Sequence, residues 1–248
     1  MKRYKYTLVL SLLFLLALNS CKKTTEGVSE IIDFPQLTGG SLGFGTAGEY
    51  NDPGLFKVSG TDTVDVTNQC RVVITNLSGG TSNDLSEKGL YELKYIFEWK
   101  GLEFDAGSRT VLIGDATDVS NENYSGKYLI ADFQRTGGIA ASWTDLIIGS
   151  KMKIERFGNS RYYFIEDLLF GHYWLGGGGR GYGPGYASQG IIRVNEDNSV
   201  SMVMALTMTA WGDTVEWENG EYDPATKTFT LSSTYAAINR TFTVTLTL

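Results

Sequence analysis

Apolar residues recur at every second position in several stretches of the chain, and no long stretch repeats them with the 3.6-residue period of a helix. Two stretches show this alternation most regularly. In the last nine residues the apolar positions are Phe242, Val244, Leu246 and Leu248. In an earlier stretch they are Tyr91, Leu93, Tyr95 and Phe97. Threonine or charged residues occupy the intervening positions, which is typical of half-buried antiparallel strands. The pattern predicts an all-β fold.

A change in composition near residue 115 predicts two β domains. Residues 109–113 are mostly apolar and β-branched, whereas residues 114–123 are polar and rich in Asp and Asn. We therefore expect a first domain over 35–114 and a second over 115–248, both of a size usual for single β domains. The second is expected to be an antiparallel meander, either barrel-like or a sandwich, with a short helix over 139–150.

The first 20 residues have the features of a signal peptide. Lys2, Arg3 and Lys5 precede an apolar run from Leu8 to Leu18, which is shorter than the roughly 20 residues of a membrane span. Leu18-Asn19-Ser20-Cys21 follows and resembles the lipobox of bacterial lipoproteins. The resemblance implies that Cys21 carries the lipid and begins the mature chain. Residues 21–34 are then expected to be a flexible tether.

Charge and composition narrow the choice of partners and chemistry. The net charge is −7, and the chain is more acidic still without the cations of its signal peptide, which argues against a nucleic-acid partner. The same acidity argues weakly against polyanionic glycans. A single histidine, His172, and two cysteines leave little material for a hydrolytic triad or a zinc site.

Carboxylate chemistry is the remaining catalytic alternative, because a glycosidase needs only two acids. The most crowded pairs are Glu166 with Asp167 and Glu216 with Glu218. A solvated strand face explains the second pair equally well. A calcium site at Asp115, Asp118 and Asn121 does not have the spacing of a calcium loop. We therefore expect no catalytic residue, no metal and no cofactor.

Residues 172–186 combine aromatic side chains with many glycines and one arginine. Glycine lets the backbone approach a ligand closely, aromatic faces pack on sugar rings or peptide side chains, and arginine donates to carboxylates or hydroxyls. The alternative is a loop whose aromatic residues only pack on its own domain. The residues expected to bind ligand, with one from a later loop, are Tyr173, Trp174, Arg180, Tyr182, Tyr186 and Trp211.

Two groups of motifs resemble known families. Tyr50-Asn51-Asp52-Pro53-Gly54, Asp65-Val66-Thr67, Gly89-Leu90-Tyr91 and Arg109-Thr110-Val111 resemble the immunoglobulin-like repeat of bacterial surface proteins. This resemblance implies an immunoglobulin-like β-sandwich over 35–114. Asp167-Leu168-Leu169-Phe170-Gly171, Gly190-Ile191-Ile192, Trp211-Gly212-Asp213 and Asn219-Gly220-Glu221-Tyr222 are similar to an uncharacterised lipoprotein family that accompanies SusC/SusD-type nutrient importers. This resemblance implies an outer-membrane, cell-surface setting. It also implies two partners, a SusC-like TonB-dependent β-barrel and a SusD-like lipoprotein.

We therefore expect a non-enzymatic, lipid-anchored accessory subunit of such an importer that binds oligosaccharides or oligopeptides. The first domain would act as a spacer and the second would contact ligand or transporter. Three alternatives remain open: a docking subunit with no ligand of its own, a carboxylate-based hydrolase, and a lipocalin-like carrier of an apolar ligand.

Overall fold

A computed structural model of the chain describes residues 34–136, 147–175 and 180–248. The signal peptide, Cys21 and all but the last residue of the expected tether lie outside these ranges, as does most of the helix expected over 139–150, whose residues 147–149 form a turn. Across the described ranges the helical segments are four one-turn 3-10 helices, η1 (Thr67–Gln69), η2 (Ala116–Asp118), η3 (Pro184–Tyr186) and η4 (Ala236–Ile238). None of the helices in this part of the chain has the length and apolar character needed to cross a membrane. The predicted all-β class is confirmed.

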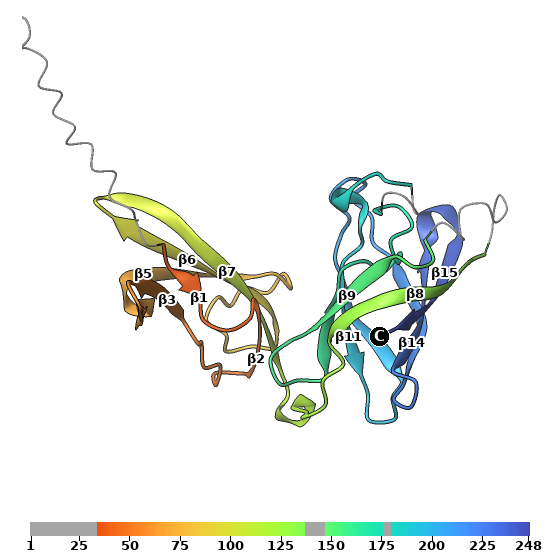
Figure 1. Cartoon of the computed structure of the whole chain (residues 1–248), viewed down its shortest axis with the longest axis horizontal. Helices are drawn as coiled ribbons and strands as arrows, with labels where there is room; N and C mark the ends of the chain where they lie inside the picture. Colours follow the sequence, from red (N-terminus) through yellow and green to blue (C-terminus); the bar gives the residue numbers. More distant parts are fainter. Residues whose placement is uncertain (1–33, 137–146, 176–179) are drawn as a thin grey trace, which may run out of the picture. The chain divides into compact units, whose positions relative to one another are not determined.

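The region before residue 115 contains two small sheets (Figure 1). The three-stranded sheet consists, in spatial order, of β1 (Gln36–Leu37), β3 (Leu55–Ser59) and β4 (Asp62–Asp65). The four-stranded sheet consists of β2 (Leu42–Thr46), β7 (Leu102–Gly114), β6 (Gly89–Trp99) and β5 (Cys70–Asn76). Only β2 and β7 pair in parallel, whereas the other neighbouring strands in the two sheets are antiparallel. The four aromatic and aliphatic side chains predicted to alternate inward on β6 are all buried.

A buried ion pair joins two of the motifs that resemble the immunoglobulin-like repeat. Arg109 is 1% exposed, and its Nη1 lies 2.6 Å from Oδ1 of Asp52. Arg109 also donates to the Thr38 carbonyl at 2.7 Å, while Tyr95 donates its hydroxyl to Asp52 Oδ2 at 2.7 Å. A charge this deeply buried requires a partner and hydrogen bonds, so the network ties the start of this region to its last strand.

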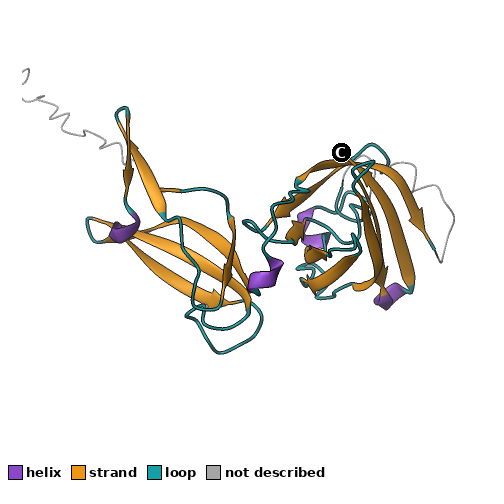
Figure 2. Cartoon of the chain, turned by 90° about the horizontal axis from the view of Figure 1, so that it is seen from below, coloured by secondary structure: helices purple, strands orange, loops and turns teal. Residues whose placement is uncertain are grey.

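The region after residue 115 forms one eight-stranded sheet. Its strands, in spatial order, are β12 (Val200–Ala205), β11 (Gly190–Val194), β10 (Tyr162–Ile165), β9 (Lys151–Arg156), β8 (Gly126–Arg135), β15 (Arg240–Thr247), β14 (Thr228–Tyr235) and β13 (Glu216–Asp223). All neighbouring strands are antiparallel, and β15 returns to pair with β8. The strands curve around a common interior, as Figures 1 and 2 show.

The two edge strands, β12 and β13, nearly close this sheet into a barrel. An isolated bridge joins Ser199 to Glu221 at one end of the seam. The indole Nε1 of Trp217 donates to the Val200 carbonyl across the seam at 3.2 Å. The region after residue 115 is therefore barrel-like, with up-and-down strands, which settles the choice between barrel and sandwich that the sequence left open.

Buried side chains fill the interior of this barrel-like sheet. Phe242, Val244 and Leu246 on β15 are at most 1% exposed, as their alternation with threonine predicts. They join one cluster with aromatic and aliphatic residues from the other strands. Leu248 is 62% exposed, so its assignment to the inward face was wrong, because β15 ends one residue earlier at Thr247. The filled interior leaves the end of the barrel as the place for a site.

Candidate functional site

The strands of the barrel run alternately up and down, so every second connection lies at the same end. The longest connections share one of these two ends. The turns at the opposite end, 157–161, 195–199 and 224–227, are short. At the other end, which we call the barrel mouth, lie the described parts of the β8–β9 and β10–β11 connections (147–150, 166–175 and 180–189), the connection 206–215 and the short turn 236–239. Binding residues are found preferentially on loops that a rigid scaffold holds in place, and the mouths of β-barrels are frequent ligand sites.

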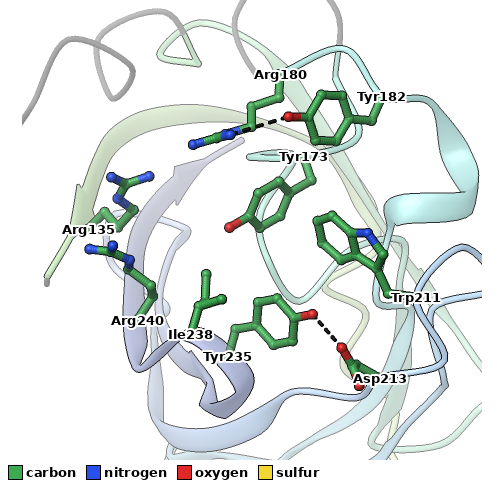
Figure 3. Close-up of a pocket in the computed structure, with 9 residues that line it drawn as sticks. All are labelled: Arg135, Tyr173, Arg180, Tyr182, Trp211, Asp213, Tyr235, Ile238 and Arg240. Atoms are coloured by element: carbon green, nitrogen blue, oxygen red, sulfur yellow. Dashed lines mark hydrogen bonds between the residues drawn. The ribbon is translucent and has the colours of Figure 1, made fainter. Parts of the chain in front are cut away.

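A cavity of about 460 Å³ lies at the barrel mouth (Figure 3). Its described lining residues come from the ends of β8, β14 and β15 and from three of the connections at the mouth. They are Arg135, Tyr173, Arg180, Tyr182, Trp211, Asp213, Tyr235, Ile238 and Arg240. This lining contains four aromatic rings, three guanidinium groups and one carboxylate. The volume is within the range usual for sites that bind small molecules.

Aromatic rings pack against one another to form one wall of the cavity. Trp211 stacks on Tyr235, with ring centroids 5.8 Å apart and an interplanar angle of 12°. Tyr173 meets Trp211 edge to face at 4.9 Å. Tyr173 and Tyr235 are each 5% exposed, whereas Trp211 is 39% and Tyr182 47% exposed. The buried rings therefore support two large aromatic faces that remain open to solvent.

Strand register brings two of the arginines together. Phe242 on β15 lies directly opposite Arg135 on β8, and Arg240 stands two residues before Phe242. Residues two apart in a strand share a face, so the guanidinium groups of Arg135 and Arg240 lie on the same side of the cavity (Figure 3). Arg180 reaches the cavity from the 166–189 connection and donates to the Tyr182 hydroxyl at 3.2 Å.

The positive charge of the arginines affects Arg135 and the single histidine. Burial lowers the pKa of Arg135 below its usual value, and the positive charges of Arg240 and Arg180 lower it further. His172 is 1% exposed beneath the cavity, and burial followed by the charges of the three arginines lowers its pKa to about 4. At neutral pH the imidazole is uncharged.

The carboxylates of Asp167 and Asp213 accept hydrogen bonds from other groups of the protein near the barrel mouth. Asp213 accepts a hydrogen bond from the Tyr235 hydroxyl at 2.5 Å and so fixes one ring of the aromatic wall. Asp167 is fully buried and accepts hydrogen bonds from the backbone amides of Leu169, Gly171 and Ser188, at 3.0, 2.7 and 2.8 Å. Burial raises the pKa of Asp167 to about 7, against the opposing effect of these amides. Asp167 thereby holds together the base of the 166–189 connection.

The cavity brings together four of the six residues that the sequence predicts as ligand-binding. Tyr173, Arg180, Tyr182 and Trp211 line it. Tyr186 packs behind it, with ring centroids 5.1 Å from Tyr182 and 4.9 Å from Trp211. Trp174 is half-buried and does not belong to the described lining. Sequence reasoning missed five lining residues, Arg135, Asp213, Tyr235, Ile238 and Arg240.

The other candidate residues lie elsewhere. Glu216 and Glu218 are exposed, as expected of a solvated strand face, and Glu166 accepts from the Lys153 amide at 2.7 Å. Asp118 is 3% exposed and pairs with Arg193 at 2.8 Å. Among the described residues, no group of three or more His, Cys, Asp and Glu side chains is placed to hold a metal ion.

Comparisons with known proteins locate the chain in one family. No curated protein matches it. Among solved structures, the lipoprotein BT2262 from Bacteroides thetaiotaomicron is similar, with 26% sequence identity and a TM-score of 0.44 over 86% of this chain and 98% of that one. A family model for a C-terminal domain matches residues 117–248, which is more than half of the chain and includes the whole barrel. The chain belongs to the family that this C-terminal domain defines.

Proposed function

We propose that this chain is a non-enzymatic binding protein that captures an oligosaccharide or oligopeptide at the barrel mouth. The observation that carries the proposal is the cavity itself, in which solvent-open aromatic faces stand opposite a cluster of guanidinium groups. Exposed aromatic rings held in place by buried neighbours bind a ligand at a low cost in conformational entropy. The arginines supply donors for hydroxyls, carbonyls or carboxylates.

The chemistry of the lining favours binding over catalysis. Asp213 is the single carboxylate among the described lining residues, and it already accepts a hydrogen bond from the Tyr235 hydroxyl. A glycosidase of the usual type requires two carboxyl groups across the scissile bond. His172 lies beneath the cavity, where its Nε2 faces the Arg135 guanidinium at 3.1 Å. The filled barrel interior likewise gives no support to a carrier of an apolar ligand.

A ligand panel tests the binding proposal. The mature full-length chain would be titrated by calorimetry with neutral and acidic oligosaccharides and with oligopeptides. Trp211→Ala and Tyr182→Ala each remove one exposed face of the wall, and together they are expected to weaken binding at least roughly tenfold. Trp99→Ala is the matched control, because Trp99 is a half-buried tryptophan of the first region. Binding that survives the double substitution would contradict this site, and a chain that binds nothing would favour the docking-only alternative.

We further propose that the chain is anchored in the outer membrane through lipid on Cys21 and serves a SusC/SusD-type importer. This part rests on the lipobox-like segment before Cys21 and on the family resemblance of the second domain. Affinity purification of the tagged chain from detergent-solubilised outer membranes tests it. Co-elution of a large β-barrel and a second lipoprotein is expected, and a Cys21→Ser variant should lose the membrane association. Elution of the chain alone would contradict the importer role.

A further inference from the structure

The barrel mouth concentrates positive charge on an acidic protein. The chain has a net charge of −7, yet the described lining of the cavity holds three arginines against one aspartate. These arginines come from positions 135, 180 and 240 and converge through the fold (Figure 3). Like charges that lie close together repel one another, which destabilises the folded protein unless a negative charge offsets the repulsion.

Arg240 has donor capacity that the described protein does not use. Its Nη1 is buried and has no hydrogen-bond partner among the residues that the structure describes. Leaving a buried donor unsatisfied is costly, and such groups are uncommon in native proteins. An acceptor atom that enters the cavity beside Arg240 would satisfy this donor.

Repulsion acting on Arg135 indicates the charge of that acceptor. The charges of Arg240 and Arg180 add to burial in lowering the pKa of Arg135, so the Arg135 guanidinium lies within the field of the other two. A bound anion would reverse this unfavourable interaction, and charge-assisted hydrogen bonds from guanidinium to carboxylate or sulfate are about twice as strong as neutral ones.

We propose that the barrel mouth binds an acidic saccharide. Its carboxylate or sulfate lies among Arg135, Arg180 and Arg240, and its sugar ring packs on the exposed faces of Trp211 and Tyr182. This inference rests on the proposed binding function and specifies its ligand class. It also revises the expectation that the acidity of the chain disfavours anionic glycans, because the local charge at the mouth is opposite in sign to the net charge.

The lining favours a saccharide over a peptide. Ile238 is the single aliphatic side chain among the described lining residues. A peptide recognised through its side chains would require apolar subsites, or a free strand edge for backbone pairing. Flat rings surrounded by donors instead match a sugar, which presents a C–H face and a rim of hydroxyls.

Matched acidic and neutral ligands test the charge preference on the mature full-length chain. The probes are oligogalacturonates of two to six residues, each compared with its uronamide, which keeps the shape and removes the charge. Lactose sulfated on galactose, compared with lactose, distinguishes sulfate from carboxylate. We expect the acid of at least one pair to bind roughly 10–100-fold more tightly than its neutral counterpart, with the preference decreasing as salt is raised.

Arginine variants test whether the preference for acidic saccharides arises at the barrel mouth. Arg240→Gln is expected to remove most of the difference between acid and neutral partner, and Arg240→Lys to restore only part of it because lysine lacks the planar fork. Arg180→Gln, at an exposed position, repeats the test if Arg240→Gln fails to fold. Arg71→Gln is the control, because Arg71 is an exposed arginine of the first region that pairs with Glu103.

The outcomes separate this inference from the proposed function. Equal affinity for acidic and neutral saccharides would overturn the inference and leave the binding function standing. Selective binding of peptides with a free C-terminal carboxylate over amidated peptides, without binding of acidic saccharides, would overturn the ligand class. Absence of binding to every saccharide and peptide would contradict the binding function itself. A preference that Arg71→Gln reduces as much as Arg240→Gln does would overturn the assignment to the barrel mouth.

Discussion

Nη1 of Arg135 lies 3.1 Å from Nε2 of His172. A guanidinium can only donate, so the histidine ring must accept at Nε2 and carry its proton on Nδ1. That Nδ1 is buried, with no hydrogen-bond partner among the described residues. The imidazole also stacks on Phe133, with ring centroids 5.8 Å apart. His172 therefore accepts a hydrogen bond from an arginine that lines the cavity, and its imidazole is neutral when it does so.

This arrangement predicts that acid weakens the fold through His172. The folded-state pKa is about 4, below the ordinary value of 6.5, so the unfolded chain takes up a proton first as the pH falls. The contribution of His172 to stability is full above about pH 6.5 and is lost as the pH falls from 6.5 toward 4. Each unit of pKa difference corresponds to about 1.4 kcal/mol, so the loss is on the order of 2–3 kcal/mol.

The measurement compares urea unfolding of the wild type and His172→Gln from pH 7.5 to 4.5. The comparison is necessary because Asp167, whose pKa is raised to about 7, acts in the opposite direction over the same range. The free energy of unfolding of the wild type should fall relative to the variant as the pH decreases. A difference between the two proteins that stays constant with pH would contradict the neutral, buried histidine.

The buried pair of Arg109 and Asp52 is expected to dominate the electrostatic stability of the first region. Asp52→Ala leaves the Arg109 guanidinium buried without its carboxylate, which is expected to cost about 3–5 kcal/mol. Glu103→Ala removes the partner of Arg71 from a pair whose side chains are 58% and 62% exposed. That control should cost less than about 1 kcal/mol. Chemical unfolding monitored by circular dichroism checks both values, and similar losses for the two variants would contradict the buried network.

Alanine substitutions at two glycines of the barrel mouth distinguish the cost of backbone strain from the cost of steric overlap. Both have positive φ, +82° at Gly171 and +74° at Gly212. A Cβ on Gly212 would meet nothing within 4 Å, whereas on Gly171 it would lie 2.8 Å from Cγ of Leu175. Gly212→Ala should therefore cost about 1–2 kcal/mol from the left-handed backbone alone. Gly171→Ala should cost about 1–3 kcal/mol more. Thermal unfolding of both variants measures the difference, and equal losses would show that the 166–189 connection is packed less tightly than described.

Strand alternation made much of the fold predictable. The period-two patterns around Tyr91 and Phe242 correspond to β6 and β15, whose inward side chains are buried. The assembly of all eight strands into one sheet was not predictable, because it depends on pairing between β8 and β15, which are about a hundred residues apart in sequence. No local pattern encodes a contact at that separation.

The candidate site was predictable only where its residues are close in sequence. Tyr173, Arg180 and Tyr182 belong to one glycine-rich connection, for which the composition left ligand binding and packing on its own domain as the two interpretations. Arg135 and Arg240 reach the cavity through strand register, and each is an ordinary arginine at a strand end in the sequence. The positive character of the mouth therefore became visible only with the fold.

A methyl-resolved NMR titration tests most directly whether ligand binds at the barrel mouth. The mature chain would carry isotope-labelled isoleucine methyl groups and be titrated with the saccharide that binds most tightly in the panel. Ile238 lines the cavity and is 41% exposed, whereas Ile74 and Ile96 lie on β5 and β6 of the first region. Binding at the mouth predicts a saturable shift of the Ile238 methyl signal while the signals of Ile74 and Ile96 stay in place. Saturation with an unmoved Ile238 signal, or with shifts confined to the first region, would contradict the barrel mouth as the binding site.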